Sequence, residues 1–144
     1  MKNEASIDGV VVAGQPTDEE IASLPSRGVK TLVNVRLRHE LVEPEGPKAD
    51  AVGLLYAEVP FNSDTITFAD VHGVRQALEH CAHGEVVVHC QGGTRAAVVT
   101  AIVAAERARE GHHGALRRIA DAGFDIEGTA YEAFIGRYFS RPGQ

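Results

Sequence analysis

The sequence predicts an α/β protein with a mainly parallel central sheet flanked by helices. Short β-branched runs alternate with longer segments of helical periodicity, a pattern typical of strands joined by helical crossovers. Val86, Val87 and Val88 form an apolar run, which favours a middle strand covered on both faces. The 144 residues match the usual size of one domain, so we expect a single domain over residues 1–144.

The first elements are indicated by a β-branched run and a capping signal. Residues 7–13 form one predicted strand, closed by Gly-Gln-Pro. Thr17 and Glu20 have capping-box spacing and predict a short helix, which Gly28 helps to end. Residues 30–35 are compact and apolar enough for a central strand.

The middle of the chain begins with a charged segment. Residues 36–50 combine prolines, glycine and many charges, which predicts a surface loop that runs into a short helix. Residues 54–59 form the next predicted strand. Thr67 is placed to cap a helix that continues through Cys81 and stops at Gly84.

The last third is mostly helical. A strand at residues 85–89 leads into the segment 90–95, and a long helix is predicted over residues 96–110, stopping at Gly111. Two further helices are expected near residues 115–122 and 129–139, the second beginning with a capping box at Thr129 and Glu132. Because ligands of parallel α/β sheets bind beyond the carboxyl ends of the strands, Cys90 is expected at a ligand site.

Composition excludes several classes of protein. Apolar residues make up 44% and charged residues 24% of the chain, as in ordinary globular domains rather than disordered or fibrous ones. The formal charge of −6 does not fit the broad basic surface that nucleic-acid binding requires, so we expect no nucleic-acid partner. If the protein binds an anion, we expect it to do so in one focused pocket.

Membrane and export signals are not predicted. The longest nearly apolar stretch, residues 96–105, is ten residues long, whereas a membrane-spanning helix needs about twenty. Residues 1–6 lack the apolar core of a signal peptide. The two cysteines, Cys81 and Cys90, are therefore expected to be free thiols, and we expect a cytoplasmic protein.

The segment between His89 and the predicted long helix has the composition of an anion site. Paired glycines let successive N–H groups turn inward, the helix N-terminus adds partial positive charge, and an arginine supplies a planar fork of donors. Such surroundings lower a cysteine pKa from about 8.5 to between about 3.5 and 7.5. We therefore predict Cys90 as a nucleophile. The residues predicted to bind the anion are Gln91, Gly92, Gly93, Thr94 and Arg95.

The residues around this segment each allow two interpretations. His89 either fills the end of the strand or positions the 90–95 segment by a side-chain hydrogen bond. Arg36 and its neighbours Arg38 and His39 either line the substrate site or form a solvated loop. Glu40 is a candidate partner for an arginine, either Arg95 or Arg36.

The chain resembles a bacterial phosphatase-like family (DUF442-type) related to the beta-lactamase-hydrolase-like proteins, within the protein tyrosine and dual-specificity phosphatase superfamily. The resemblance rests on Ala-Gly-Gln-Pro at 13–16, Val-Asn-Val-Arg at 33–36 with Glu40 shortly after, Val-Pro at 59–60 and His-Cys-Gln-Gly-Gly-Thr-Arg-Ala at 89–96. It implies a small anionic or phosphorylated substrate, with Cys90 carrying the phosphoryl group and Arg95 holding the phosphate oxygens.

The family resemblance also implies a general acid on a separate loop. Asp64 follows the third predicted strand, 26 positions before Cys90, roughly where the superfamily's acid lies. Protonation of a poor leaving group is worth about 10²–10⁴-fold in rate. The other reading is that Asn-Ser-Asp at 62–64 is turn chemistry before a helix.

Two departures from the superfamily bear on activity. Four residues separate Cys90 from Arg95, whereas the usual phosphatase loop has five; the short form is common in the bacterial family but is also similar to rhodanese sulfurtransferases. Ala96 stands where many phosphatases have Ser or Thr. Three hypotheses follow: a phosphomonoesterase acting through Cys90, a sulfurtransferase carrying a Cys90 persulfide, and an inactive anion-binding module. No zinc or nucleotide motif is present, so we predict no metal and no cofactor.

Overall fold

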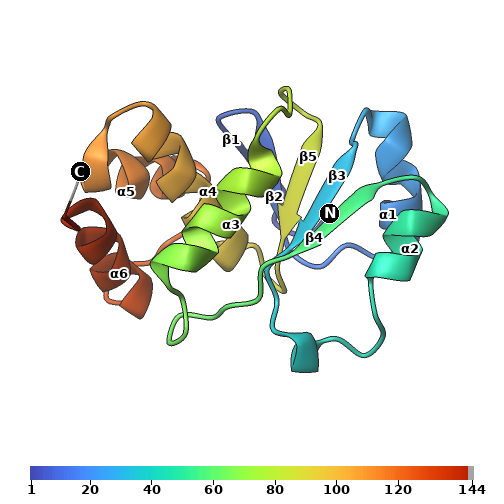
Figure 1. Cartoon of the computed structure of the whole chain (residues 1–144), viewed down its shortest axis with the longest axis horizontal. Coiled ribbons are helices and arrows are strands. Elements are labelled where there is room, and N and C mark those ends of the chain that lie inside the picture. Colours follow the sequence, from blue (N-terminus) through green and yellow to red (C-terminus); the bar gives the residue numbers. More distant parts are fainter. Residues whose placement is uncertain (143–144) are drawn as a thin grey trace.

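The computed structural model describes residues 1–142, which form a five-stranded sheet between two layers of helices (Figure 1). The strand order is β1-β2-β5-β3-β4, with β1 antiparallel to β2 and all other neighbours parallel. The strands are β1 (Ala5–Ile7), β2 (Val10–Ala13), β3 (Thr31–Asn34), β4 (Leu55–Glu58) and β5 (Val86–His89). The predicted fold class is confirmed, and β5 is the central strand.

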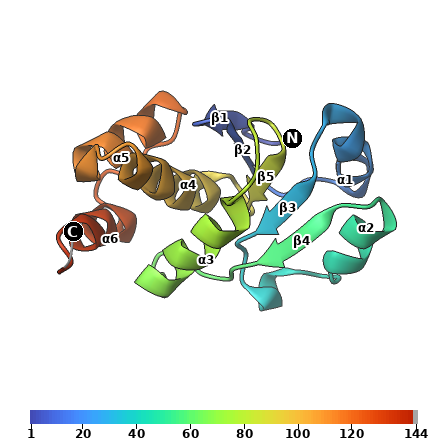
Figure 2. The ribbon, with the colours of Figure 1, turned by 45° about the horizontal axis from the view of Figure 1, so that its top comes forward.

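The helices form one small and one large layer. The small layer contains α1 (Asp18–Ser23), the 3₁₀ turn η1 (Leu24–Arg27) and α2 (Gly46–Ala51); a second 3₁₀ turn, η2 (Arg38–Glu40), lies in the loop before α2. The large layer contains α3 (Phe68–Leu78), α4 (Thr94–Arg107), α5 (Gly111–Asp121) and α6 (Ala130–Phe139) on the other face of the sheet (Figure 2). Within residues 1–142, no helix has the length and apolar character that crossing a membrane requires.

The valines of β5 divide between two cores because successive side chains of a strand point to opposite faces. Val86 and Val88 pack in the larger core with α3 to α6, while Val87 packs in the smaller one beneath α1 and α2. All three are at most 1% exposed. Burial on both faces is what an uninterrupted apolar run predicts for a central parallel strand.

The prediction of one strand over residues 7–13 is wrong, because a tight hairpin divides that segment. Asp8 and Gly9 both have positive φ, 52° and 78°, and β1 and β2 pair antiparallel on either side of them. An Asp-Gly pair favours this two-residue turn. The hairpin places the residues before β1 at the carboxyl end of β2.

Boundaries of α3, α4 and α5 also differ from the predicted ones, and one predicted cap is missing. Helix α3 has the predicted cap at Thr67 but ends at Leu78, so Cys81 lies beyond it, half-buried in a turn, and Gly84 is not its stop. Helix α4 starts two residues early and ends at Arg107, and Gly111 begins α5 instead of ending α4. Thr129 makes no side-chain cap on α6, since its hydroxyl donates to the Ile126 carbonyl instead.

Candidate active site

The parallel strands bring three loops together at their carboxyl ends. In the sheet register His89 pairs with Ala13 of β2 and Asn34 of β3. The loops that follow β2, β3 and β5 therefore meet at one edge of the sheet. The Cys90 loop, defined as residues 90–95, is the central one, as the sequence predicts.

Cys90 is buried at the start of this loop, with 1% of its surface exposed. Its N–H donates to the Ala13 carbonyl at 3.1 Å, and the Gly93 N–H donates to its Sγ at 3.1 Å. An amide that donates to sulfur stabilises a negative charge there, as does the positive end of a helix. Cys90 Sγ has both the amide donor and the helix N-terminus beside it, because Gly93 is also the N-cap of α4.

Two glycines permit the close packing of the Cys90 loop. A Cβ at Gly14 would lie 2.7 Å from the Gln91 carbonyl oxygen, a distance that real Cβ atoms do not reach. Gly93 has a φ of 100°, and a Cβ there would lie 2.9 Å from the Phe124 ring. Gly14 therefore lets the β2 loop approach the Cys90 loop, and Gly93 lets the chain turn into α4.

Arg95 is held by acceptors on one side of its guanidinium. Nη1 and Nη2 donate to the two carboxylate oxygens of Glu40 at 2.7 and 2.8 Å, and Nη1 also donates to the Phe61 carbonyl at 3.1 Å. These bonds use three of the five N–H groups of the guanidinium. The remaining pair, Nε–H and one hydrogen of Nη2, has no partner among residues 1–142. This pair has the side-by-side geometry that binds two oxygens of one anion.

The Glu40–Arg95 ion pair fixes the charge of both groups. The Arg95 guanidinium lowers the pKa of Glu40 to about 2, with further help from the Leu37 N–H and Arg36 against the opposing effect of burial. Glu40 in turn raises the pKa of Arg95, and so does the charge of Cys90. Glu40 is therefore ionised at neutral pH, and the predicted pairing of Glu40 with Arg95 is confirmed.

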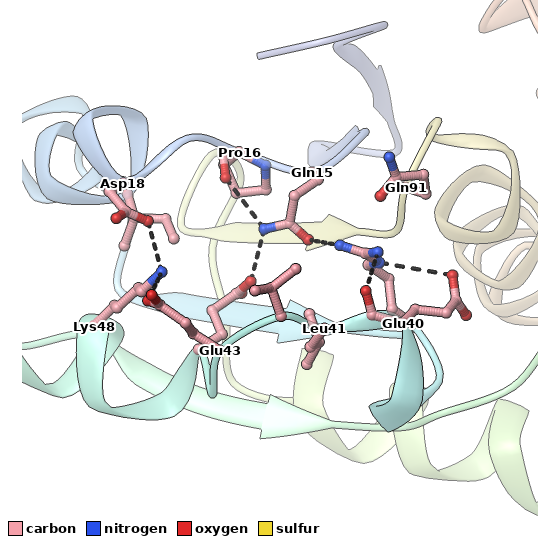
Figure 3. Close-up of a pocket in the computed structure, with 12 residues that line it drawn as sticks. Gln15, Pro16, Asp18, Glu40, Leu41, Glu43, Lys48 and Gln91 are labelled. Carbon is pink, nitrogen blue, oxygen red and sulfur yellow. Dashed lines mark hydrogen bonds and ion pairs between the residues drawn. The ribbon is translucent and has the colours of Figure 1, made fainter.

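A chain of hydrogen bonds continues from Glu40 around the outside of the Cys90 loop (Figure 3). Arg36 Nη2 donates to the Glu40 carbonyl and Arg36 Nη1 to Gln15 Oε1, both at 2.8 Å. Gln15 Nε2 donates to Glu45 Oε2 at 2.8 Å, and the other oxygen of Glu45 lies 2.5 Å from His89 Nε2. The chain closes at the cysteine, since His89 Nδ1 lies 3.3 Å from the Cys90 carbonyl oxygen.

His89 and Glu45 form a buried pair that links the small helical layer to the Cys90 loop. His89 is fully buried and Glu45 is 3% exposed. Both nitrogens of His89 face oxygen acceptors, the Cys90 carbonyl and the Glu45 carboxylate. Each residue thus supplies the polar partner that the other needs inside the protein.

A pocket of about 470 Å³ opens beside the Cys90 loop, between that loop and the small helical layer (Figure 3). Gln91 lines it on the side of the loop, and Lys48 lines it on the side of α2. Lys48 is paired with Asp18 at 2.8 Å and with Glu43 at 3.2 Å. Polar and apolar side chains both line the pocket, and its lysine is already paired with two carboxylates.

Asp64 lies on the loop between β4 and α3. Its N–H donates to Asn62 Oδ1, as does the Thr65 N–H, so the segment has the predicted turn chemistry. The same loop contacts the site, because the Phe61 carbonyl accepts from Arg95. The Asp64 carboxylate is exposed.

Tyr131, near the start of α6, is a site residue that the sequence gives no reason to single out. Burial raises the pKa of Tyr131, and among the charges that act on its hydroxyl are Arg95, Cys90 and Asp64. Tyr131 is 6% exposed and packs in the larger core, so the folding of α6 onto that core brings its phenol within electrostatic range of the Cys90 loop.

The structure distinguishes between the two interpretations of the residues around the Cys90 loop. Arg36 belongs to the site region and not to a solvated loop, with only 11% of its side chain exposed, whereas Arg38 is 80% exposed. His89 both fills the strand end and contacts the Cys90 carbonyl. Thr94 is the first residue of α4. Within residues 1–142 no group of three side chains is arranged to hold a metal ion.

Comparison with known proteins identifies similar sequences and folds. The model of the family "Beta-lactamase hydrolase-like protein, phosphatase-like domain" matches residues 5–107. A Beta-lactamase hydrolase-like protein of Agrobacterium fabrum is 37% identical over 94 residues, which are 60% of this chain and 21% of that protein. The chain thus spans about a fifth of the length of this relative.

Solved phosphatase structures share the fold at low sequence identity. PTPMT1 in complex with PI(5)P superposes with a TM-score of 0.79 at 18% identity, covering 94% of each chain. The core catalytic domain of the PP-IP phosphatase SIW14 from S. cerevisiae, in complex with citrate, gives 0.71 at 15% identity, covering 95% of this chain and 85% of that one. These likenesses show the fold.

Proposed function

Since the chain belongs to the beta-lactamase hydrolase-like protein, phosphatase-like domain family, we propose that it is a cysteine-dependent hydrolase of phosphomonoesters. The observation that carries the proposal is the Gly93 N–H that donates to Cys90 Sγ at 3.1 Å at the N-terminus of α4. An amide donor and a helix N-terminus are both groups that stabilise negative charge on a nucleophilic sulfur. A buried cysteine with a purely structural role needs neither an amide donor to its sulfur nor a helix N-terminus beside it.

The proposed reaction has two steps that balance in atoms and charge. The Cys90 thiolate attacks phosphorus, an S–P bond forms, the O–P bond to the leaving oxygen breaks, and that oxygen takes a proton from a general acid to leave as an alcohol. Water then attacks the phosphorus of this intermediate and gives a proton back to the conjugate base of that acid, the S–P bond breaks, and inorganic phosphate leaves while the thiolate is restored. The thiolate is unchanged overall, and one water molecule is consumed.

The anion is bound by Arg95 and by backbone amides. The free Nε–H and Nη2–H edge of Arg95 supplies two parallel donors for phosphate oxygens. Glu40 holds the opposite edge and so keeps the free edge in one orientation. The amides of Gln91, Gly92, Gly93 and Thr94 supply the other donors in this proposal.

Asp64 is proposed as the acid that protonates the leaving oxygen. Its loop is tied to Arg95 through Phe61, and its charge acts on Tyr131 together with the charges of Cys90 and Arg95. Asp64→Asn should slow hydrolysis of an alkyl phosphate about 10²–10⁴-fold and hydrolysis of p-nitrophenyl phosphate much less, because nitrophenolate leaves without a proton. Asp50→Asn, on the exposed surface of α2, is the control. Equal effects on both esters would remove Asp64 from this role.

The decisive experiment compares the two cysteines. Cys90→Ser should abolish hydrolysis of p-nitrophenyl phosphate, while Cys81→Ser, in the turn after α3, should leave it unchanged. Mass spectrometry of the enzyme quenched during turnover should find a phosphoryl group on Cys90. Full activity of the Cys90→Ser variant would refute the proposal.

The four-residue spacing between Cys90 and Arg95 favours a second candidate, sulfur transfer through a Cys90 persulfide. A thiosulfate:cyanide assay tests it, and mass spectrometry then detects one added sulfur atom in place of a phosphoryl group. Asp64→Asn should leave sulfur transfer nearly unchanged.

The third candidate is an inactive anion-binding module, which Ala96 favours because many phosphatases have Ser or Thr at this position. Binding of phosphate with neither phosphatase nor sulfurtransferase activity would support it.

The proposal extends to domain, substrate and compartment. Residues 1–144 are proposed to form one domain, supported by the shared core of α4 with α5 and α6. A phosphorylated small molecule is the proposed substrate class, by analogy with PTPMT1 bound to PI(5)P and the PP-IP phosphatase SIW14. Cys81 and Cys90 are both free thiols, which supports a reducing compartment such as the cytoplasm.

A further inference from the structure

The segment before β1 lies directly against the Cys90 loop, although it is far away in the sequence. Asn3 Nδ2 donates to the Gly92 carbonyl at 2.8 Å, across 89 positions of the chain. The Lys2 carbonyl accepts from the Gly14 N–H at 2.7 Å, and Gly14 and Gly92 form an isolated bridge. Three segments therefore lie side by side, and the outermost one supplies a side chain to the loop.

This contact determines which way the next amide points. In a trans peptide the C=O of one residue and the N–H of the following residue point in opposite directions. The Gly92 carbonyl is directed outward to Asn3, so the Gly93 N–H of the same peptide is directed the other way. There it meets Cys90 Sγ at 3.1 Å.

The two preceding peptides of the loop are held by the same principle. The Cys90 carbonyl faces His89 Nδ1 at 3.3 Å, and the Gln91 carbonyl accepts from the Gln15 N–H at 3.1 Å. Three successive carbonyls are thus directed to partners outside the loop. The N–H groups of Gln91, Gly92 and Gly93 are correspondingly directed away from those partners.

The peptide between Gly92 and Gly93 most needs such an external partner. Neither residue has a Cβ to restrict rotation, and a Cβ built on Gly92 would meet open space. The side chain of Asn3 is the partner that holds its carbonyl. We propose that Asn3 is a positioning residue, which fixes the Gly92–Gly93 peptide so that its N–H faces Cys90.

The backbone around Asn3 is itself well anchored. Asn3 has a φ of 51°, a left-handed conformation that asparagine tolerates better than most residues. On one side the Lys2 carbonyl binds Gly14. On the other, the Glu4 carboxylate accepts two hydrogen bonds from Arg27, at 3.1 and 2.7 Å. The Asn3 amide is therefore presented from a fixed position although the residue is exposed.

The test replaces Asn3 with glycine, which removes the donor without adding charge or backbone strain. Asp8→Gly is the matched control, because Asp8 has nearly the same φ, 52°, and lies in the β1–β2 turn. Both variants are made in a Cys81→Ser background, so that only Cys90 reacts with iodoacetamide. The readouts are the pH midpoint of alkylation and the protection given by inorganic phosphate.

Asn3→Gly should move the alkylation midpoint to higher pH by about 0.5–1 unit and weaken phosphate protection about fivefold, as expected for one hydrogen bond. Asn3→Asp, which keeps the shape but presents an acceptor to the Gly92 carbonyl, should do so at least as strongly. Asp8→Gly should do neither. Unfolding transitions of all variants show that each is folded.

Equal midpoints and equal phosphate protection in Asn3→Gly and Asp8→Gly would overturn the proposal. The inference deepens the proposed function but does not depend on turnover for its test, because alkylation measures only the state of Cys90. If Cys90→Ser kept its phosphatase activity, the proposed function would fail while the effect of Asn3 on alkylation would still be measured.

Discussion

The buried pair of Glu45 and His89 should contribute more to stability than any exposed ion pair of this protein. Glu45→Ala leaves the fully buried His89 with Nε2 facing no acceptor and removes the carboxylate that accepts from Gln15. Removing one partner of a buried pair costs about 3–5 kcal/mol. The exposed pair of Glu43 with Lys48 at 3.2 Å sets the contrast, because such pairs contribute about 0–1 kcal/mol.

A second variant separates charge from hydrogen bonding. Glu45→Gln keeps the volume, and its amide can donate to His89 Nε2 while its carbonyl accepts from Gln15. The imidazole then needs only the proton on Nδ1, and both of its nitrogens remain bonded. The expected loss is about 1 kcal/mol, the order of one hydrogen bond.

The assay is equilibrium unfolding in urea, with the free energy of unfolding of each variant taken at a common slope. Glu45→Ala should lose about 3–5 kcal/mol, which is a large share of the 5–15 kcal/mol that typical domains possess. Glu43→Ala should lose less than about 1 kcal/mol. If Glu45→Ala proved as stable as Glu43→Ala, the pair would not be the buried, mutually dependent unit described above.

Two further predictions concern Glu40 and the glycines of the Cys90 loop. The pKa of Glu40 is lowered from 4.5 to about 2, so its stabilising effect is complete above pH 4.5 and is lost as the pH falls towards 2. The difference in unfolding free energy between wild type and Glu40→Gln should be constant from about pH 8 to pH 5 and should shrink below pH 5. A difference that grew on acidification would contradict the ion pair of Glu40 with Arg95. Gly93→Ala should destabilise the protein by at least about 1–3 kcal/mol and weaken phosphate binding, because φ is 100° and the new Cβ meets Phe124. Gly92→Ala, whose Cβ meets nothing, is its control in the same denaturation and binding measurements, and similar losses in both would refute the steric argument.

The alternation of strands and helices could be predicted because each element has a local signal. The predicted capping box at Thr17 and the predicted cap at Thr67 are observed, whereas the capping box predicted at Thr129 is not. The strand pattern does not predict the hairpin at Asp8 and Gly9, because β-branched residues continue on both sides of it, although Asp-Gly is itself a hairpin signal. The apolar spacing places the end of α3 too late, because Cys81 continues that spacing while the backbone has already turned at His80, with a φ of 64°.

The sequence predicts the part of the site whose residues lie close together along the chain. Cys90 and Arg95 share one loop, so their proximity follows from sequence. The sequence offers Glu40 as a partner for either Arg95 or Arg36, and the structure pairs its carboxylate with Arg95. Nothing local marks Glu45 as buried beside His89, because a glutamate among prolines and charges reads as solvated. Asn3 reaches the loop only through the hairpin of β1 and β2.

Gln91 belongs to two environments at once, the loop around the Cys90 thiol and the pocket beside that loop. Its peptide forms part of the turn that surrounds the sulfur, while its side chain borders the 470 Å³ pocket. Any uncharged replacement other than proline, which lacks the N–H, keeps the main-chain groups of Gln91. Such an exchange therefore changes the edge of the neighbouring pocket while the loop backbone beside the thiol stays the same.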